Sequence, residues 1–362
     1  MVKVIGILGS GQLGRMIALA AAELGVRAHI FAPDADQSPA GDVAYATTQA
    51  AYDDAEALDA FAAAIDGVTS EFENVPSSAL ARIARQLDRV NPSIAALDTA
   101  QDRLSEKLMA QSLDIATPAF WNVTSEAELA AALAALPNDG FLKTRRDGYD
   151  GKGQRRVSTG DDSAAIWQDM GGKPLILESK IDFVAEASFL IARDADGQIA
   201  HFPATMNQHS NGILATSTAP APLDDTILQK GYEAIEHIAA HLDLCGILAM
   251  ESFIAADGTL IFNEIAPRPH NSFHWTIEGA TISQFEQAAR LAAGLPMRPA
   301  MARGIWRMEN LLGQHGEQIP GFYADPAIHT HIYGKEAFRE GRKIGHITYA
   351  LSDSSDKSNK VS

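Results

Sequence analysis

The first hundred residues alternate between short apolar runs and alanine-rich stretches of helical periodicity. Val2–Leu8 is an apolar run that predicts a strand, Val26–Phe31 predicts a second strand, and Arg15–Leu24 between them predicts a helix. Strands that alternate with helices in this way form βαβ units with a parallel sheet. We therefore predict a Rossmann-like α/β domain over residues 1–98.

After residue 98 the pattern changes to strand pairs separated by amphipathic helices, which is typical of an α+β domain. Ser93–Asp98 is expected to be a short connection into a helix. The further strands and helices expected are Ser125–Leu136, Leu175–Leu177, Ala185–Ile191 with Ile199–Ala204, Ile227–Leu242, Leu248–Ala255 with Leu260–Ile265, and Ile282–Ala293. We assign residues 99–297 to this α+β domain, 298–351 to a small β-rich domain, and 352–362 to a flexible tail.

One predicted hairpin places two acids opposite each other. Asp257-Gly258 is a typical two-residue hairpin loop between Leu248–Ala255 and Leu260–Ile265, and with that loop Glu251 pairs with Glu264. Paired side chains have Cβ atoms about 5 Å apart, so two carboxylates there repel each other. The apolar neighbours favour burial, and magnesium, which binds carboxylate oxygens together with substrate phosphates, would compensate the charge. A register slip of one residue, or exposure of both acids, would remove this reason for a metal.

The segment Lys143–Gln154, KTRRDGYDGKGQ, predicts a phosphate-binding loop at the tip of a hairpin. Its three glycines let backbone N–H groups approach a ligand without obstruction from Cβ atoms, and its two lysines add positive charge. The loop lacks the Gly-Lys-Ser/Thr ending and the following helix of a Walker A loop. Gln154–Val157 is instead expected to be a returning strand. An ordinary basic, glycine-rich turn is the alternative for this segment taken alone.

A second glycine-rich segment, Gly9–Gly14, matches the Gly-x-Gly-x-x-Gly pattern between a predicted strand and helix. With Asp34 about 20 residues further on, it is typical of dinucleotide sites, but the same geometry offers N–H groups to any phosphate monoester. Glu71 and Glu73 follow a later predicted strand, at the edge where open α/β sheets bind ligands. A role at the start of the next helix is the alternative for these acids.

Charge and composition limit the possible classes of function. Asp and Glu total 46 against 29 Lys and Arg, a net charge of −17, so nucleic acid is not expected as a main partner. Cys245 is the single cysteine, which excludes an internal disulfide and a cysteine-rich zinc site. The chain starts without a secretory leader pattern, and no apolar stretch reaches about 18 residues. We expect a cytoplasmic enzyme without membrane contact.

Together these segments resemble the ATP-grasp superfamily and, within it, the family of 5-(carboxyamino)imidazole ribonucleotide synthetases. The resemblance covers nearly the whole chain, and its most specific runs are GYDGKGQ at 148–154, NEIAPRPHNS at 263–272, and YGK and GRKIGH between 333 and 346. It implies an ATP-grasp fold with a Rossmann-like N-terminal domain and a small β-rich C-terminal domain. It also implies a carbon–nitrogen ligase of purine biosynthesis that uses ATP, magnesium and bicarbonate to carboxylate aminoimidazole ribonucleotide through carboxyphosphate, commonly as a homodimer.

The resemblance further implies roles for individual residues. ATP would be bound by Arg103, Lys143, Gly148, Tyr149, Asp150, Gly151, Lys152, Gly153, Gln154, Glu178, Ser179, Lys180, Ile181, Glu186, His209, Asn263 and Glu264. The ribonucleotide would be bound by Gln12, Leu13, Glu73, Tyr149, Lys335 and Arg342. Glu251 and Glu264 would bind magnesium, and Arg268 with Asn271 would be the catalytic residues that steady bicarbonate and carboxyphosphate.

Three positions depart from the family pattern. Ser10 and Phe273 stand where many relatives have glycine, and Asp147 precedes the phosphate loop where glycine is frequent. Ser10 is harmless if its φ is negative, whereas Phe273 brings a bulky ring close to Asn271. Asp147 would either add negative charge near the phosphates or point into water.

Other functions share parts of this pattern. A formate-using glycinamide ribonucleotide transformylase would share Lys143, Glu251 and Glu264 but not the segment 335–346. An NAD-dependent oxidoreductase would use Gly9–Gly14 but would leave the phosphate loop and the acid pair unexplained. A non-catalytic nucleotide-binding protein of the same fold is disfavoured because the lysines, the acids and the arginine are all present.

Overall fold

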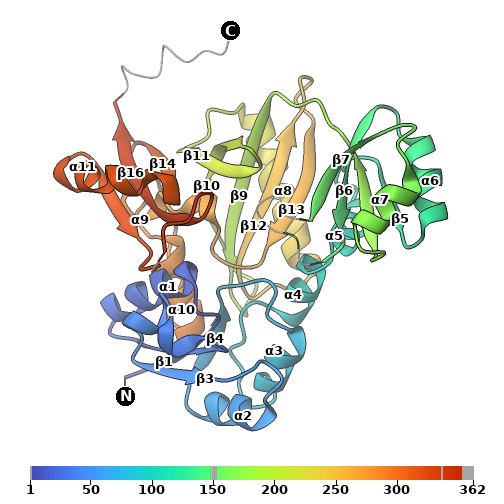
Figure 1. The fold of residues 1–362 in the computed structure, drawn as a ribbon. Coiled ribbons are helices and arrows are strands. Elements are labelled where there is room, and N and C mark those ends of the chain that lie inside the picture. Colours follow the sequence, from blue (N-terminus) through green and yellow to red (C-terminus); the bar gives the residue numbers. More distant parts are fainter. Residues whose placement is uncertain (1, 147, 149–152, 336, 353–362) are drawn as a thin grey trace.

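The computed structural model describes residues 2–146, 148, 153–335 and 337–352, which form three sheets with flanking helices (Figure 1). The N-terminal sheet is parallel, with strand order β3-β2-β1-β4, as the βαβ pattern predicts. Its elements are β1 (Val4–Leu8), α1 (Gln12–Glu23), β2 (Arg27–Ala32), β3 (Ala46–Gln49), α2 (Ala55–Ala63), β4 (Gly67–Ser70) and α3 (Ser77–Ile83).

Two helices, α4 (Ile94–Ala100) and α5 (Arg103–Ser112), lead out of this sheet. The expectation that Ser93–Asp98 is a connection was wrong. The Ser93 side chain accepts a hydrogen bond from Ala96 N at 3.3 Å and so caps the start of α4. A serine directly before an apolar run is a common helix start, so its position explains the difference.

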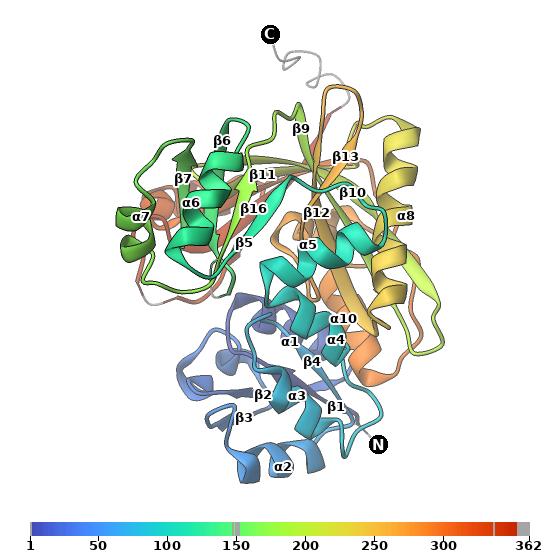
Figure 2. The same cartoon turned by 90° about the vertical axis from the view of Figure 1, so that its right-hand side faces the viewer.

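The second sheet is small and antiparallel, with strand order β5-β8-β6-β7. Its strands are β5 (Phe120–Val123), β6 (Asp139–Thr144), β7 (Gln154–Ser158) and β8 (Leu175–Ser179), and its helices are α6 (Glu126–Ala135) and α7 (Ser163–Asp169). Lys143 pairs with Gln154, which confirms the predicted hairpin. Helices α6 and α7 lie beside this sheet (Figure 2). Leu129 and Leu133 of α6 and Ile166 of α7 belong to its buried core.

The third sheet has eight strands in the order β13-β12-β9-β10-β11-β14-β16-β15. Its elements and those that flank it are β9 (Ala185–Arg193), β10 (Ile199–Ser210), β11 (Ile213–Ala219), α8 (Asp225–His241), β12 (Gly246–Ile254), β13 (Leu260–Ala266), α9 (Thr276–Gly279), α10 (Gln284–Ala293), β14 (Ile305–Leu312), α11 (Ile319–Ala324), β15 (His329–Ile332) and β16 (Lys343–Leu351). The C-terminal strands β14, β15 and β16 therefore extend the sheet of the central region and do not form a sheet of their own. The division at residues 98 and 297 stays a prediction.

Helix α10 joins the N-terminal sheet to the large sheet. One buried cluster contains Ile5 and Ile17 from the first, Phe285 of α10, and Ala192 and Ile247 from the second. A Cβ atom at Gly67 would lie 2.1 Å from the carbonyl oxygen of Ala292, so only glycine permits this approach of β4 to α10. The two regions thus share one core, which fixes the strand ends of the N-terminal sheet relative to the large sheet. No helix of the described residues is long and apolar enough to cross a membrane.

Candidate active site

The two faces of the large sheet differ in polarity. Leu248 and Met250 of β12 point toward α8, where Ile235 and Ile238 complete a buried apolar cluster. The alternate positions of β9, β10, β12 and β13 lie on the opposite face because side chains alternate along a strand. This polar face carries Glu186, Ser188, Asn207, His209, Glu251 and Glu264.

Glu251 and Glu264 are directly paired across β12 and β13, as the sequence predicts, but the hairpin differs from the prediction. Its loop has three residues and not two, because Ala255 N bonds to Thr259 O and Gly258 adopts a positive φ of 78°. That loop alone would shift the register by one. A β-bulge at Asn263 adds one residue to β13 and restores the pairing of the two acids.

The acid pair carries negative charge in a partly buried position. Burial, together with the nearby Glu264 carboxylate, raises the pKa of Glu251 to about 7. Nε2 of His270 lies 3.4 Å from Oε1 of Glu251, but burial and the Arg268 charge hold the pKa of His270 well below its ordinary value, so the ring is neutral. A divalent cation fits these two oxygen ligands, with phosphate oxygens or water completing its coordination. The described residues contain no group of three or more His, Cys, Asp or Glu that could hold a metal alone.

The raised pKa of Glu251 predicts that metal binding depends on pH. The raised pKa means that Glu251 is protonated below about pH 7 and must lose that proton to bind a cation. We expect the magnesium concentration for half-maximal activity to fall as pH rises from 6 to 8, by up to about tenfold per pH unit below the pKa. Without metal, the folded state binds more protons than the unfolded chain between pH 4.5 and 7, so its stability falls as pH rises through that range. Magnesium titrations at several pH values test the first of these changes, and thermal unfolding without magnesium at the same pH values tests the second.

A second charged group lies at the stem of the phosphate loop. Nζ of Lys143 lies 2.9 Å and Nζ of Lys107 3.7 Å from the same oxygen of Glu178. Burial opposes ionisation of Glu178, but the two lysines outweigh it and hold its pKa below the ordinary value. Lys143 is thus held by a carboxylate at the base of the loop.

The start of α5 anchors the same loop. Arg103 donates to the carbonyl oxygens of Thr144 at 3.0 Å and Gly148 at 2.6 Å, and Arg145 forms two hydrogen bonds with Asp102. Gly153, at the other end of the loop, has a φ of 71°. The predicted loop residues Asp147, Tyr149, Asp150, Gly151 and Lys152 lie outside the described residues.

Glu186 and His209 form a hydrogen-bonded pair on the polar face. Burial favours the neutral ring, but the hydrogen bond to Glu186 and the charge of Glu251 outweigh it and raise the pKa of His209. A protonated His209 adds positive charge beside the acid pair. Of the predicted ATP contacts at 178–181, Glu178 and Ser179 end β8 and the next two residues follow it, where the Lys180 side chain is exposed.

Arg268 connects the large sheet to the N-terminal sheet. It forms an ion pair with Glu73, which lies just beyond β4, and donates to the Pro269 carbonyl oxygen at 3.0 Å. Burial opposes the charge of Glu73, but Arg268 outweighs it and lowers the pKa of that carboxyl. The predicted substrate contact and the predicted catalytic residue are therefore partners in this structure.

The glycine-rich turn before α1 already holds a carboxylate. Glu71 accepts hydrogen bonds from Gly11 N at 2.9 Å and Gly14 N at 3.1 Å. A Cβ atom at Gly9, whose φ is 105°, would lie 2.6 Å from the Glu71 side chain. The N–H groups that a dinucleotide phosphate would use are thus taken up within the chain, which argues against an NAD site.

The other predicted residues lie around these groups. Gln12 begins α1 and Leu13 is buried beside it, while both amide atoms of Asn271 are buried without a hydrogen-bond partner. Nζ of Lys335 donates to the Lys343 carbonyl oxygen at 2.8 Å, and the charge of Lys343 lowers the pKa of Glu251 against the larger effects that raise it. The charge of Lys343 thus acts on Glu251, while Arg342 is exposed.

The departures at Ser10 and Phe273 have local explanations. Ser10 has no positive φ, and its hydroxyl donates to Asp34 at 2.6 Å, so the side chain is accommodated without strain. Phe273 is fully buried and packs in the core shared with α10.

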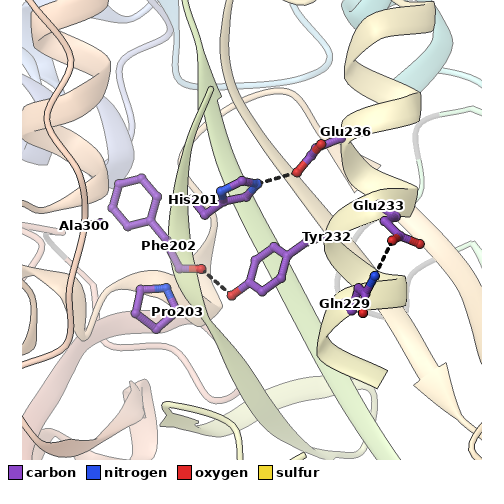
Figure 3. Close-up of a pocket in the computed structure, with 8 residues that line it drawn as sticks. All are labelled: His201, Phe202, Pro203, Gln229, Tyr232, Glu233, Glu236 and Ala300. Atoms are coloured by element: carbon purple, nitrogen blue, oxygen red, sulfur yellow. Dashed lines mark hydrogen bonds and ion pairs between the residues drawn. The ribbon is translucent and has the colours of Figure 1, made fainter. Parts of the chain in front are cut away.

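A surface pocket lies between β10 and α8 (Figure 3), and its lining residues do not include Glu251 or Glu264. His201 points toward Glu236, with 2.6 Å between Nε2 and Oε1. The Tyr232 hydroxyl donates to Phe202 O and accepts from Ala204 N, where the register of β10 shifts. These contacts stabilise the strand, and we assign the pocket a structural role.

The sequence pattern does not indicate Glu106, Lys107 or His270 as parts of the site. Glu106 and Lys107 are buried, at 3% and 1% exposed, although charged side chains on an amphipathic helix usually face water. Burial, with the Glu264 charge, raises the pKa of Glu106 to about 8. Glu71 lies at the sheet edge where the sequence predicts ligand binding, but only the fold shows that it accepts hydrogen bonds from Gly11 N and Gly14 N.

Comparisons with known proteins agree with this arrangement. The family models for the ribonucleotide synthetase preATP-grasp domain, the ATP-grasp domain and the phosphoribosylaminoimidazole carboxylase C-terminal domain match residues 1–101, 108–285 and 307–360. An N5-carboxyaminoimidazole ribonucleotide synthase from Brucella melitensis is 45% identical over 95% of each chain.

Solved structures give the same result. The N5-carboxyaminoimidazole ribonucleotide synthetase of Thermus thermophilus superposes with a TM-score of 0.88 and 40% identity, covering 96% of this chain and 93% of that one. The Aspergillus clavatus N5-carboxyaminoimidazole synthase, crystallised with ADP and 5-aminoimidazole ribonucleotide, superposes with a TM-score of 0.88 and 29% identity, covering 97% and 94%. The chain therefore belongs to the N5-carboxyaminoimidazole ribonucleotide synthase family and has the ATP-grasp fold with a pre-ATP-grasp N-terminal domain.

Proposed function

We propose that the protein catalyses the ATP- and bicarbonate-dependent carboxylation of 5-aminoimidazole ribonucleotide in purine biosynthesis, through carboxyphosphate. The family assignment gives the N5-carboxyaminoimidazole ribonucleotide synthase activity. The single observation that carries the mechanism is the direct pairing of Glu251 with Glu264 on the polar face of the large sheet. No biotin-carrier lysine motif is present in the sequence, so the substrate amine attacks carboxyphosphate directly.

In the first step, a bicarbonate oxygen attacks the γ-phosphorus of ATP, and ADP leaves with the electrons of the broken bond. Phosphoryl transfer requires positioning and neutralisation of charge more than a protein nucleophile. Lys143 and the loop that ends at Gly153 would hold the phosphates, and Arg103 anchors the stem of that loop. A magnesium ion bound by Glu251 and Glu264 would supply charge neutralisation at the phosphate oxygens.

In the second step, the exocyclic amine of the ribonucleotide attacks the carbon of carboxyphosphate. Phosphate leaves with the electrons of the broken carbon–oxygen bond, and the nitrogen passes one proton to the departing phosphate. Carboxyphosphate hydrolyses readily, so its site must exclude water. Arg268, partly buried and flanked by two prolines, would bind the carboxylate with paired hydrogen bonds, together with Asn271. In this structure that guanidinium forms an ion pair with Glu73.

The ribonucleotide would lie between the N-terminal sheet and the C-terminal segment. Gln12, Leu13 and Glu73 come from the first, and Lys335 and Arg342 from the second. A Cβ atom at Gly334 would lie 3.5 Å from the Asp42 carboxylate, so these two parts of the chain are in contact there. Two basic residues beside that contact suit a phosphate monoester.

A substrate panel tests this function. Phosphate release from ATP should require bicarbonate and should be stimulated by 5-aminoimidazole ribonucleotide, with the carboxylated product detected by mass spectrometry. Formate with glycinamide ribonucleotide should give no stimulation. Stimulation by that second pair alone would assign the chain to the transformylase reaction.

The role of Arg342 is tested by the variant Arg342→Ala. Its KM for the ribonucleotide should rise about tenfold or more, which corresponds to a charged hydrogen bond of about 1.5 kcal/mol, while the KM for ATP stays unchanged. Arg339→Ala, at an exposed position of the same segment, is the control. An equal rise of both KM values would contradict the assigned contact.

A further inference from the structure

Two buried residues of α5 hold the backbone of β13 on either side of Glu264. Oε1 of Glu106 accepts a hydrogen bond from Ile265 N at 2.9 Å, and Nζ of Lys107 donates to the carbonyl oxygen of Asn263. These two bonds bracket Glu264.

The backbone of β13 needs such partners at this point. Because β13 is the edge strand of the eight-stranded sheet, groups on its outer side have no neighbouring strand to pair with. Asn263 is in addition the extra residue of the bulge and has no counterpart in β12. Without the bulge, the three-residue loop would place another residue opposite Glu251.

We propose that Glu106 and Lys107 are positioning residues that hold the bulge in β13 and so keep Glu264 opposite Glu251, where the two carboxylates bind the metal ion together. This inference rests on the metal role proposed above for the acid pair. Neither residue needs to contact a substrate.

The free-energy cost of burying Glu106 and Lys107 supports a specific role for these two side chains. Burial of charged side chains costs several kcal/mol per ion in general, and packed apolar residues often serve stability equally well. The hydrogen bond from the Lys107 ammonium is charge-assisted, and such bonds are shorter and more directional than neutral ones, so it defines the position of the Asn263 carbonyl more closely. Lys107 also lies 3.7 Å from Glu178, the partner of Lys143, and therefore links the acid pair to the base of the phosphate loop.

The test is manganese binding in the presence of ADP, followed by electron paramagnetic resonance. Glu106→Gln keeps an oxygen acceptor at the same reach, and its affinity should stay within about threefold of wild type. Glu106→Asp keeps the carboxyl group but is one methylene shorter, and Lys107→Met removes the donor. Each should weaken manganese binding about tenfold or more, as is typical when groups that orient metal ligands are lost.

Controls separate this proposal from the metal role itself. Gln111→Met, at an exposed position of α5, should bind manganese like wild type. The proposal would be overturned if Glu106→Asp and Lys107→Met both bind manganese with normal affinity. It would also be overturned if Glu106→Gln binds manganese weakly while Glu106→Asp binds it normally. Normal affinity in Glu264→Gln would instead overturn the metal role. The two conservative Glu106 variants decide the question if Lys107→Met does not fold.

Discussion

Replacing Glu264 by glutamine should lower kcat/KM by at least about 10³-fold while the protein still folds. A metal ion supplies several kcal/mol of charge stabilisation to the transition state of phosphoryl transfer, and each 1.4 kcal/mol is a factor of ten in rate. Glu264 lies directly opposite Glu251, so its loss leaves the cation with one carboxylate. Steady-state phosphate release and thermal unfolding measure the two effects.

The fold should tolerate this change because the native pair is repulsive. Removal of one of two facing like charges changes stability by about 1 kcal/mol or less. The pKa of Glu251 should fall toward its ordinary value, since the Glu264 charge is one of the causes that raise it. Glu233→Gln, at an exposed position of α8, is the matched control. Wild-type activity in Glu264→Gln would refute the metal role.

Replacing Arg268 by lysine should lower kcat by about 10²–10³-fold, the effect of losing one preorganised donor to the reacting group. Lysine keeps the positive charge and an ion pair with Glu73, but it cannot offer the planar, paired donors of a guanidinium. The KM for ATP should change little, because Arg268 is not among the proposed ATP contacts. Single-turnover kinetics of phosphate release separate this effect from binding.

The control for Arg268 is Arg298→Lys. Arg298 forms a long ion pair with Glu286, with 3.8 Å between the two charged groups, and is not part of the proposed site. Both variants keep the net charge of the chain, so a difference in kcat between them reports the role of the planar guanidinium of Arg268. A kcat of Arg268→Lys within about threefold of wild type would be inconsistent with an essential guanidinium.

The sequence by itself determined the local elements and the identity of the family. The βαβ period predicts the parallel N-terminal sheet, and the glycine-rich segment predicts the β6–β7 hairpin, because periodicity and turn residues report local burial and local backbone conformation. The pairing of Glu251 with Glu264 was also predicted correctly. Its derivation assumed a two-residue loop, whereas the structure has a three-residue loop whose shift the bulge at Asn263 cancels.

Only the tertiary structure decided which distant groups meet. Arg268 binds Glu73 across 195 residues of sequence, and Glu106 binds Ile265 N across 159. It also placed Glu71 on the N–H groups of the Gly9–Gly14 turn, and it joined the C-terminal strands to the large sheet. A sequence pattern reports which residues are buried along one element. Which partner neutralises a buried charge depends on how the elements pack, and that packing follows from the shared core around α10.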